Sequence, residues 1–338
     1  MKTFWALVIA RNKEFYRDNA TLIWGLVFPF IVILGFKFGY SGQSQDLFKV
    51  GVFQSTGPTS PAAADFLKTK YINFISINDG LTELAISKLR HHQYDLLLDP
   101  SGPGRYWINE TSAKGSVVEK LLLGSSQTSS AIRQSVVGGE LRYVDWLIPG
   151  IMAMNMMFSS LFGVGYTLVR YRKNGVLKRL KATPVTAFQF LAAQVLSRLS
   201  MILLTASVLF GGTLLLVRFQ MNGSYLALLV FMIVGAISMI SLGLIVASRI
   251  SSEEVAEGVL NVLTWPMMFL SGIWFSLEGA STGIRTFAKL FPLTHIVDGM
   301  RAIIIDGASL ASLWPQMLFL VVLSVVFLTI GSIIFKWS

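Results

Sequence analysis

Long apolar runs dominate the pattern of hydrophobic and polar positions along the chain. An α-helix rises about 1.5 Å per residue, so about 18 to 25 apolar residues are enough to cross the hydrocarbon core of a bilayer. Such runs occur at Thr21–Gly39, Trp146–Val169, Ala192–Val217, Tyr225–Ala247, Gly258–Leu277 and Trp314–Phe335. The pattern therefore predicts a polytopic α-helical membrane protein with six transmembrane helices.

The segment before the first run, residues 1–20, is amphipathic at helical spacing. Its aromatic and aliphatic side chains share one arc, while Lys2, Lys13, Glu14 and Arg17 lie opposite. Helices of this kind lie in the membrane interface with their aromatic side among the acyl chains. We therefore expect an interfacial helix at residues 1–20 and the first span at residues 21–40. The alternative is an ordinary extension of that span.

Residues 41–145 have the composition of a soluble domain, with ten Lys/Arg and ten Asp/Glu. Short β-type apolar runs alternate there with a helical period, which predicts a small α/β domain with a parallel sheet. The expected elements are strands at Phe48–Phe53, Tyr71–Ile77 and Tyr94–Asp99, a helix at Leu81–His92, an edge strand at Tyr106–Asn109 and a helix at Ser116–Leu141. Because the first span starts from the cytoplasm, we expect this domain to be extracytoplasmic.

Residues 146–338 contain the remaining five expected spans. Gly235, Ser238, Ser241 and Gly243 in the fourth run are small, and small residues let membrane helices approach closely. Arg198 lies near the inner end of the third run, where it either reaches the headgroups or pairs with an acidic residue of a complex. Residues 278–312 are too polar for a span, and we expect outer re-entrant helices there.

Polar and flexible side chains in the second and fifth runs predict a substrate pathway. Polar residues at membrane depth usually face the interior of a helix bundle. The candidates are Asn155, Met156, Ser159, Asn261, Trp265 and Met268. The alternative for the methionine and aromatic residues is contact with lipid or with the core. A broad route lined by methionine and aromatic groups suits an amphipathic or lipid-like substrate better than an ion.

A strongly basic loop separates the second and third runs. Val169–Pro184 contains six Lys/Arg and no acidic residue, and short loops of that kind lie on the cytoplasmic side. From Val176 the apolar side chains fall on one side of a helical wheel, and Pro184 ends the helix. The pattern predicts a two-turn amphipathic helix that suits docking into a groove on a partner. The alternative is a basic loop that only sets the topology.

Three stretches of the chain resemble permease subunits of bacterial type 2 ATP-binding-cassette exporters. They are K-E-F-x-R-D at residues 13–18, R-K-N-G-V-L-K-R-L-K-A-T-P at residues 172–184, and F-L-S-G-I-W-F at residues 269–275 with P-L-T-H-I-V-D-G-M-R at residues 292–301. Many members of that family have Glu and Thr where this chain has Lys173 and Val176. The resemblance covers the N-terminal helix, the basic loop and the last two spans.

The resemblance implies a partner ATPase that contacts a coupling loop at residues 170–188. The residues implied in this contact are Arg172, Lys173, Asn174, Gly175, Val176, Leu177, Lys178, Arg179, Leu180, Thr183 and Pro184. The acidic residues Glu253 and Glu254 of the second cytoplasmic loop predict a second contact with the partner. The two glutamates have an equally good alternative role, because acidic residues stabilise a helix N-terminus. The family works as two permeases and two ATPases, so a homodimer is expected.

The chain itself offers no motif for enzyme chemistry. It has no cysteine and no G-x-x-x-x-G-K-[ST] sequence, so it lacks the usual phosphate-binding loop for a nucleoside triphosphate. The adjacent pair His91-His92 does not have the i, i+4 spacing of a helical zinc site. We expect no catalytic residue, no metal site and no bound cofactor, with ATP and Mg²⁺ held by the partner.

These features favour an exporter permease in the bacterial inner (plasma) membrane, with both termini in the cytoplasm. A second hypothesis is a membrane-anchored sensor or assembly scaffold whose outer α/β domain binds a ligand. A self-sufficient secondary transporter is disfavoured, because its proton or ion relay needs acidic residues at membrane depth and the spans hold none.

Overall fold

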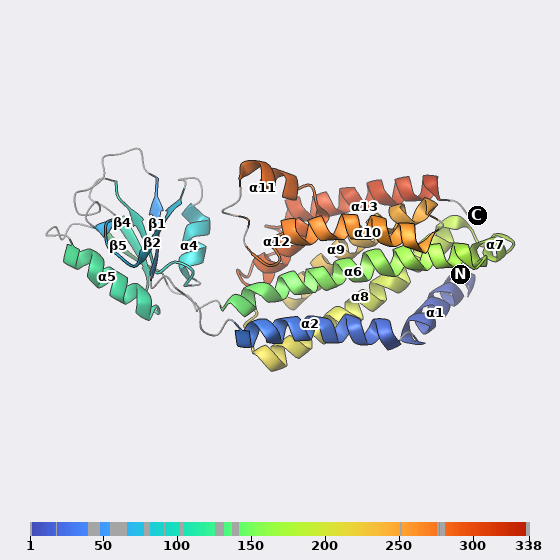
Figure 1. Ribbon diagram of the computed structural model, residues 1–338, viewed down its shortest axis with the longest axis horizontal. Helices are drawn as coiled ribbons and strands as arrows, with labels where there is room; N and C mark the ends of the chain where they lie inside the picture. Colours follow the sequence, from blue (N-terminus) through green and yellow to red (C-terminus); the bar gives the residue numbers. More distant parts are fainter. Residues whose placement is uncertain are drawn as a thin grey trace. The chain divides into compact units, whose positions relative to one another are not determined.

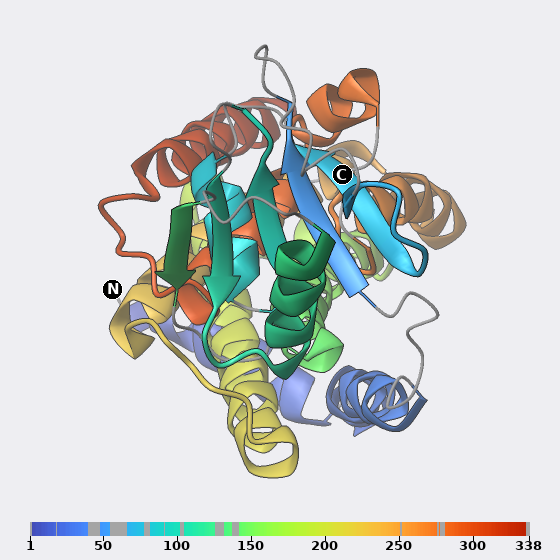
Figure 2. The ribbon, with the colours of Figure 1, turned by 90° about the vertical axis from the view of Figure 1, so that its left-hand side faces the viewer.

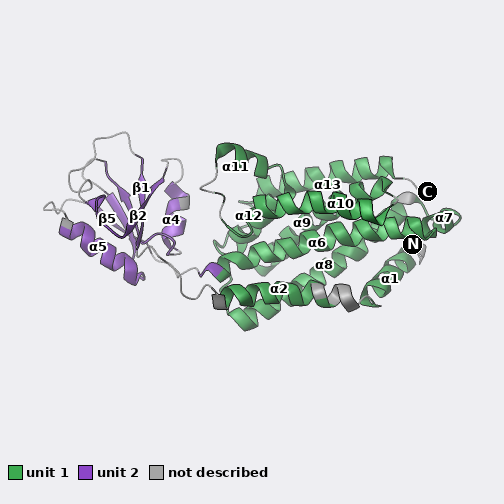
Figure 3. Ribbon diagram, in the orientation of Figure 1, with its two compact units in different colours: residues 1–39, 144–338 green, residues 40–143 purple. Residues whose placement is uncertain are grey.

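The computed structural model describes residues 2–17, 19–39, 48–54, 66–77, 82–90, 92–101, 105–125, 132–136, 142–250, 252–275, 277 and 281–335. The chain forms two compact units, one of residues 1–39 and 144–338 and one of residues 40–143 (Figure 3).

All regular secondary structure in the described part of the first unit is helical. Its helices are α1 (Lys2–Arg17), α2 (Asn19–Gly39), α6 (Tyr143–Lys173), α7 (Val176–Lys181), α8 (Ala187–Val217), α9 (Tyr225–Arg249), α10 (Glu253–Leu270), α11 (Thr282–Ala288), α12 (Pro292–Ile304) and α13 (Trp314–Ile334). Figure 1 shows α7 and both termini at one end of this unit, and α11 and α12 at the other.

Four helices of this unit are long and apolar enough to cross a membrane. They cover Tyr143–Lys173, Phe188–Val217, Tyr225–Arg249 and Trp314–Ile334, and a shorter apolar helical stretch runs from Gly25 to Lys37. The first expected span lies on α2, which continues through Pro29. The fifth differs from the expectation: α10 begins at Glu253 and ends at Leu270, so residues 271–275 of the run lie beyond this helix.

Polar residues at the helix starts explain where several of these helices begin. Thr186 and Gln189 form a reciprocal capping box at the start of α8. The hydroxyl groups of Ser224 and Ser252 accept hydrogen bonds from the backbone N–H three residues later, at the starts of α9 and α10. Each cap satisfies a backbone donor that the helix itself leaves without a partner.

The small residues of α9 allow close packing in the centre of the unit, which confirms their predicted role. Gly235, Ser238, Ser241 and Gly243 are all buried. A Cβ atom on Gly243 would lie 3.2 Å from the Cα atom of Leu161 in α6, and one on Gly235 would lie 3.0 Å from Cγ1 of Ile296 in α12. The helix α9 also packs along α13 and α8, so it is the central helix of the bundle.

The second unit contains a five-stranded sheet with the order β2-β1-β3-β4-β5. Its elements are β1 (Phe48–Phe53), β2 (Ile72–Ile77), α4 (Thr82–Arg90), β3 (Leu96–Asp99), β4 (Arg105–Asn109), α5 (Ala113–Ser125) and β5 (Ile132–Val136). Val118 and Leu122 of α5 pack on one face of the sheet, while Ala85 and Leu89 of α4 pack on the other. Figure 2 shows α5 in front of the strands.

Three expectations for this unit are wrong. The sheet is mixed and not purely parallel, because β3 and β4 pair in the antiparallel direction. Tyr106–Asn109 lies on β4, which is an interior strand because it pairs antiparallel with β3 and parallel with β5. The helix expected over Ser116–Leu141 ends at Ser125, and β5 follows. The strand β5 escaped prediction because it reads I-R-Q-S-V and is largely exposed, so it lacks the alternation of apolar and polar residues that marks a half-buried strand.

The contact between α6 and α9 gives a direct test of the packing. We expect Gly243→Leu to lower the free energy of unfolding by about 1–3 kcal/mol or more, because the added side chain meets the backbone of α6. The measurement is thermal unfolding in detergent, followed by tryptophan fluorescence. Gly211→Leu in α8 is the matched control, since no heavy atom lies within 4 Å of its Cβ position. Equal melting temperatures for the two variants would contradict this packing.

Candidate coupling surface and adjoining cavity

The predicted amphipathic helix of the basic loop is the short helix α7. Gly175 before it adopts a left-handed backbone conformation with φ +67°, which glycine tolerates without steric cost. Leu177 is buried with 0% exposure, whereas Lys178, Arg179 and Lys181 are exposed. The loop therefore rests on the bundle through an apolar anchor and presents a cationic face outward.

The remaining predicted contact residues of this loop have local roles. The side chain of Arg179 donates to the carbonyl oxygen of Asn174 at 3.3 Å, and the hydroxyl of Thr183 donates to the carbonyl oxygen of Leu180 at 2.6 Å. Val176 and Leu180 are half-buried and Pro184 is exposed. Together these contacts make a compact loop whose exposed surface includes Lys178, Arg179 and residues 181–184.

Arg172 points inward instead of toward the outer surface. It is only 8% exposed, and its guanidinium donates to the carbonyl oxygens of Ala247 at 3.0 Å, Ser248 at 2.9 Å and Ile250 at the end of α9. The last carbonyl groups of a helix have no partner within the helix and carry partial negative charge. Arg172 thus fixes the start of the coupling loop to the central helix.

The acidic start of α10 lies against the same loop. Lys173 Nζ is 3.4 Å from Oε1 of Glu253. Glu254 accepts a hydrogen bond from the hydroxyl of Ser252, and this bond lowers the pKa of its carboxyl group. Ser252 also caps α10 by accepting from the N–H of Val255 at 3.3 Å. Ser252 is therefore the capping residue, while both glutamates lie in the first turn of α10, where negative charge is favourable, and Glu253 adds a link to the basic loop.

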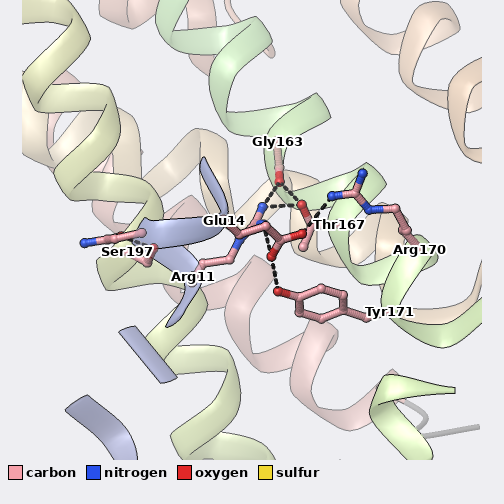
Figure 4. A network of polar contacts seen from close by, with 8 residues as sticks. Arg11, Glu14, Gly163, Thr167, Arg170, Tyr171 and Ser197 are labelled. Carbon is pink, nitrogen blue, oxygen red and sulfur yellow. Dashed lines mark hydrogen bonds and ion pairs between the residues drawn. The ribbon is translucent and has the colours of Figure 1, made fainter. Parts of the chain in front are cut away.

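A polar network ties α1 to the C-terminal end of α6 (Figure 4). Glu14 accepts hydrogen bonds from Arg11 at 2.9 Å, from Arg170 at 2.7 Å and from the hydroxyl of Tyr171. Burial acts to raise the pKa of Glu14, but the hydrogen bond from Tyr171 and the charge of Arg11 outweigh it and lower that pKa. Arg11 also donates to the hydroxyl of Thr167. The carboxylate is thus held ionised between two helices.

Sequence reasoning missed this network. The K-E-F-x-R-D run and the i, i+3 spacing of Arg11 and Glu14 mark a local pair. The partners on α6 lie more than 150 residues further along the chain. No periodicity in one sequence identifies contacts at that separation.

A cavity of about 700 Å³ adjoins this network. It is lined by residues of α1, α2, α6 and α8 together with Glu253. Two of the predicted pathway residues line it: Asn155, whose amide donates to the carbonyl oxygen of Gly25 at 2.7 Å, and Ser159. The lining also includes Arg198, whose Nε donates to the carbonyl oxygen of Ser159 at 2.6 Å.

The other predicted pathway residues lie outside the lining of this cavity. Met156 is buried within the bundle. On α10, Asn261 is half-buried, Met268 is buried, and the exposed Trp265 stacks on Phe269 with ring centroids 6.0 Å apart. The structure therefore brings together the candidates of the second run but not those of the fifth.

The fold and this surface define a class: a helical membrane protein with a cationic loop anchored to its central helix. More specifically, the chain belongs to the ABC-2 family, described as "ABC-2 family transporter protein", which matches residues 20–333.

Three curated relatives show the same affiliation. The chain is 25% identical to "Probable multidrug ABC transporter permease YbhR" of Escherichia coli K12, over 52% of this chain and 49% of the relative. It is 26% identical to "Inner membrane transport permease YhhJ" of the same organism, over 55% and 51%. It is 22% identical to "Putative transport permease YvfS" of Bacillus subtilis 168, over 56% and 77%. The match spans about half the length of the two Escherichia coli relatives.

We expect alanine substitutions of Arg172 and Lys173 to change the stability of the protein by different amounts, because the two side chains have different surroundings. Arg172→Ala leaves carbonyl groups of α9 without their charged donor, and hydrogen bonds of that type contribute about 1.5–3 kcal/mol. The Lys173 side chain is 55% exposed, and exposed ion pairs contribute only about 0.2–1 kcal/mol. We expect thermal unfolding in detergent to show a clear loss of stability for Arg172→Ala and a small change for Lys173→Ala. The reverse order would contradict the assigned contacts.

Proposed function

We propose that this chain is the transmembrane permease subunit of an ATP-driven exporter. It moves an amphipathic or lipid-like substrate, such as a drug, lipid or glycolipid, out of the cytoplasm or the inner leaflet. A separate ATPase subunit docks on the coupling loop, holds ATP and Mg²⁺ and supplies the energy. The observation that carries the proposal is the exposed cationic face of α7 on a loop that Arg172 fixes to the central helix.

The proposal gives the loop a mechanical role. A partner with two conformations can bias a membrane protein only if its contacts differ between the two states of that protein. A push on α7 is passed through Arg172 to α9 and through the Lys173–Glu253 pair to α10. Because α9 packs against α8, α12 and α13, a small displacement at the loop reaches most of the bundle.

In the proposed topology six helices cross the membrane: the four long apolar helices together with α2 and α10. Both termini and α7 then lie in the cytoplasm, and the α/β unit lies outside the bacterial inner membrane. The proposed assembly is a homodimer with the pathway along its two-fold axis. The helix α10 exposes Val255, Val262 and Trp265 on one side. A second copy would cover that apolar face. Two ATPases would serve the pair of permeases.

Charge reversal on the exposed face of α7 tests the docking directly. We expect the double variant Lys178→Glu and Arg179→Glu to weaken the association with the ATPase at least about tenfold, because it places like charges where the partner's acidic groups are expected. The measurement is ATP hydrolysis and ATPase content of the affinity-tagged chain, purified from its native membrane.

The matched control reverses the same number of charges at the other end of the bundle, with Arg285→Glu and Lys289→Glu, which are exposed. It should retain the ATPase. The proposal fails if the α7 variant is inserted normally and keeps full ATP hydrolysis, which is also the outcome expected for a sensor or scaffold.

A further inference from the structure

The lining of the cavity beside α1 contains both apolar and basic side chains. Phe28, Pro29, Phe158 and Phe162 form an apolar part of the lining. The rings of Phe158 and Phe162 follow one another along α6 with centroids 5.7 Å apart. Three arginines, Arg11, Arg170 and Arg198, contribute the basic part. A volume of about 700 Å³ lies in the range of pockets that hold small organic ligands.

The charges of the lining do not balance. Glu14 pairs with Arg11 and Arg170 at the same time. The other lining glutamate, Glu253, is 3.4 Å from the ammonium group of Lys173. Among the residues that the structure describes, no carboxylate lies within ion-pair distance of Arg198. The cavity therefore has an excess of positive charge, and Arg198 is the cation without a counter-ion.

Arg198 is both buried and held in place. It is 7% exposed, and its Nη2 donates to the hydroxyl of Ser159 at 2.9 Å. Its guanidinium lies 5.4 Å from the ring centroid of Phe15. Gly163 leaves room for it, since a Cβ atom there would lie 1.9 Å from Cζ of Arg198. The position of the guanidinium is thus fixed by Ser159 and Phe15 and by the space at Gly163.

The neutral partners of Arg198 leave hydrogen-bonding capacity and charge unused. The carbonyl and hydroxyl of Ser159 accept from Nε and Nη2, while no acceptor in the described part of the chain contacts Nη1. A buried cation without a counter-ion is unfavourable, and an anion that enters the cavity would offset that cost. Guanidinium groups bind phosphate oxygens well because their N–H donors match the geometry.

We propose that this cavity binds the phosphate headgroup of an anionic lipid, with Arg198 as its counter-ion and the acyl chain along Phe28, Phe158 and Phe162. The apolar residues of the lining favour a lipid phosphate over free phosphate, because free phosphate has no acyl chain to cover these side chains. The binding itself requires no ATPase, so this inference can fail while the exporter function stands, and the reverse.

The experiment is a thermal-unfolding titration of the purified full-length chain in a zwitterionic detergent. The probes are dioleoyl phosphatidic acid, dioleoyl phosphatidylcholine and inorganic phosphate. We expect the melting temperature to rise with phosphatidic acid and to change little with the other two. Equal stabilisation by the two lipids would overturn the role of the anion. A full effect of inorganic phosphate alone would overturn the role of the lipid chain.

Two variants connect the effect to Arg198. Arg198→Gln should weaken the binding of phosphatidic acid at least about tenfold, whereas Arg285→Gln, an exposed arginine on α11, should bind like the wild type. Arg198→Lys keeps the charge, and so remains informative if the glutamine variant does not fold. It should still prefer phosphatidic acid to phosphatidylcholine, but with weaker binding than the wild type. Wild-type affinity in both Arg198 variants would refute the proposed site.

Discussion

The contact between the Arg172 guanidinium and the carbonyl oxygens at the end of α9 is the constraint on which the α7 end of the helical unit depends. The contact supplies hydrogen-bond donors to the carbonyl groups at the helix terminus, and it supplies acceptors to the buried guanidinium. Gly175 and the start of α7 follow within four residues of Arg172, so α7 begins close to the end of α9. Since α9 packs closely on α6 through Gly243 and on α12 through Gly235, the loop is joined through α9 to the packed centre of the helical unit.

The positive charges of four arginines near this end of the helical unit are stabilised in three different ways. Arg172 is compensated by neutral backbone carbonyls, and Arg11 and Arg170 by the shared carboxylate of Glu14. Arg198 is left with the neutral oxygens of Ser159 beside a cavity. The first two arrangements join helices, which suits transmission of movement. The third leaves a charge available for a ligand, and it lies where α1 meets the bundle.

The sequence predicted those features that depend on local pattern. Periodicity predicts the long apolar helices and the short helix α7, with buried Leu177 and exposed Lys178. Residue size predicts the packing role of Gly235 and Gly243. The inward orientation of Arg172, the Arg11–Thr167 contact and the cavity did not, because each joins residues that lie far apart in the chain. The strand β5 was missed for a different reason: its polar, exposed residues carry no alternating pattern.

The most direct test of the central claim is the accessibility of a single thiol on the coupling loop. The chain contains no cysteine, so Lys181→Cys introduces the only one, at an exposed position beside the docking face. A membrane-impermeant maleimide should label it in inverted membrane vesicles but not in right-side-out vesicles, and the bound ATPase subunit should protect it. Labelling in right-side-out vesicles, or labelling that the ATPase leaves unchanged, would contradict the account.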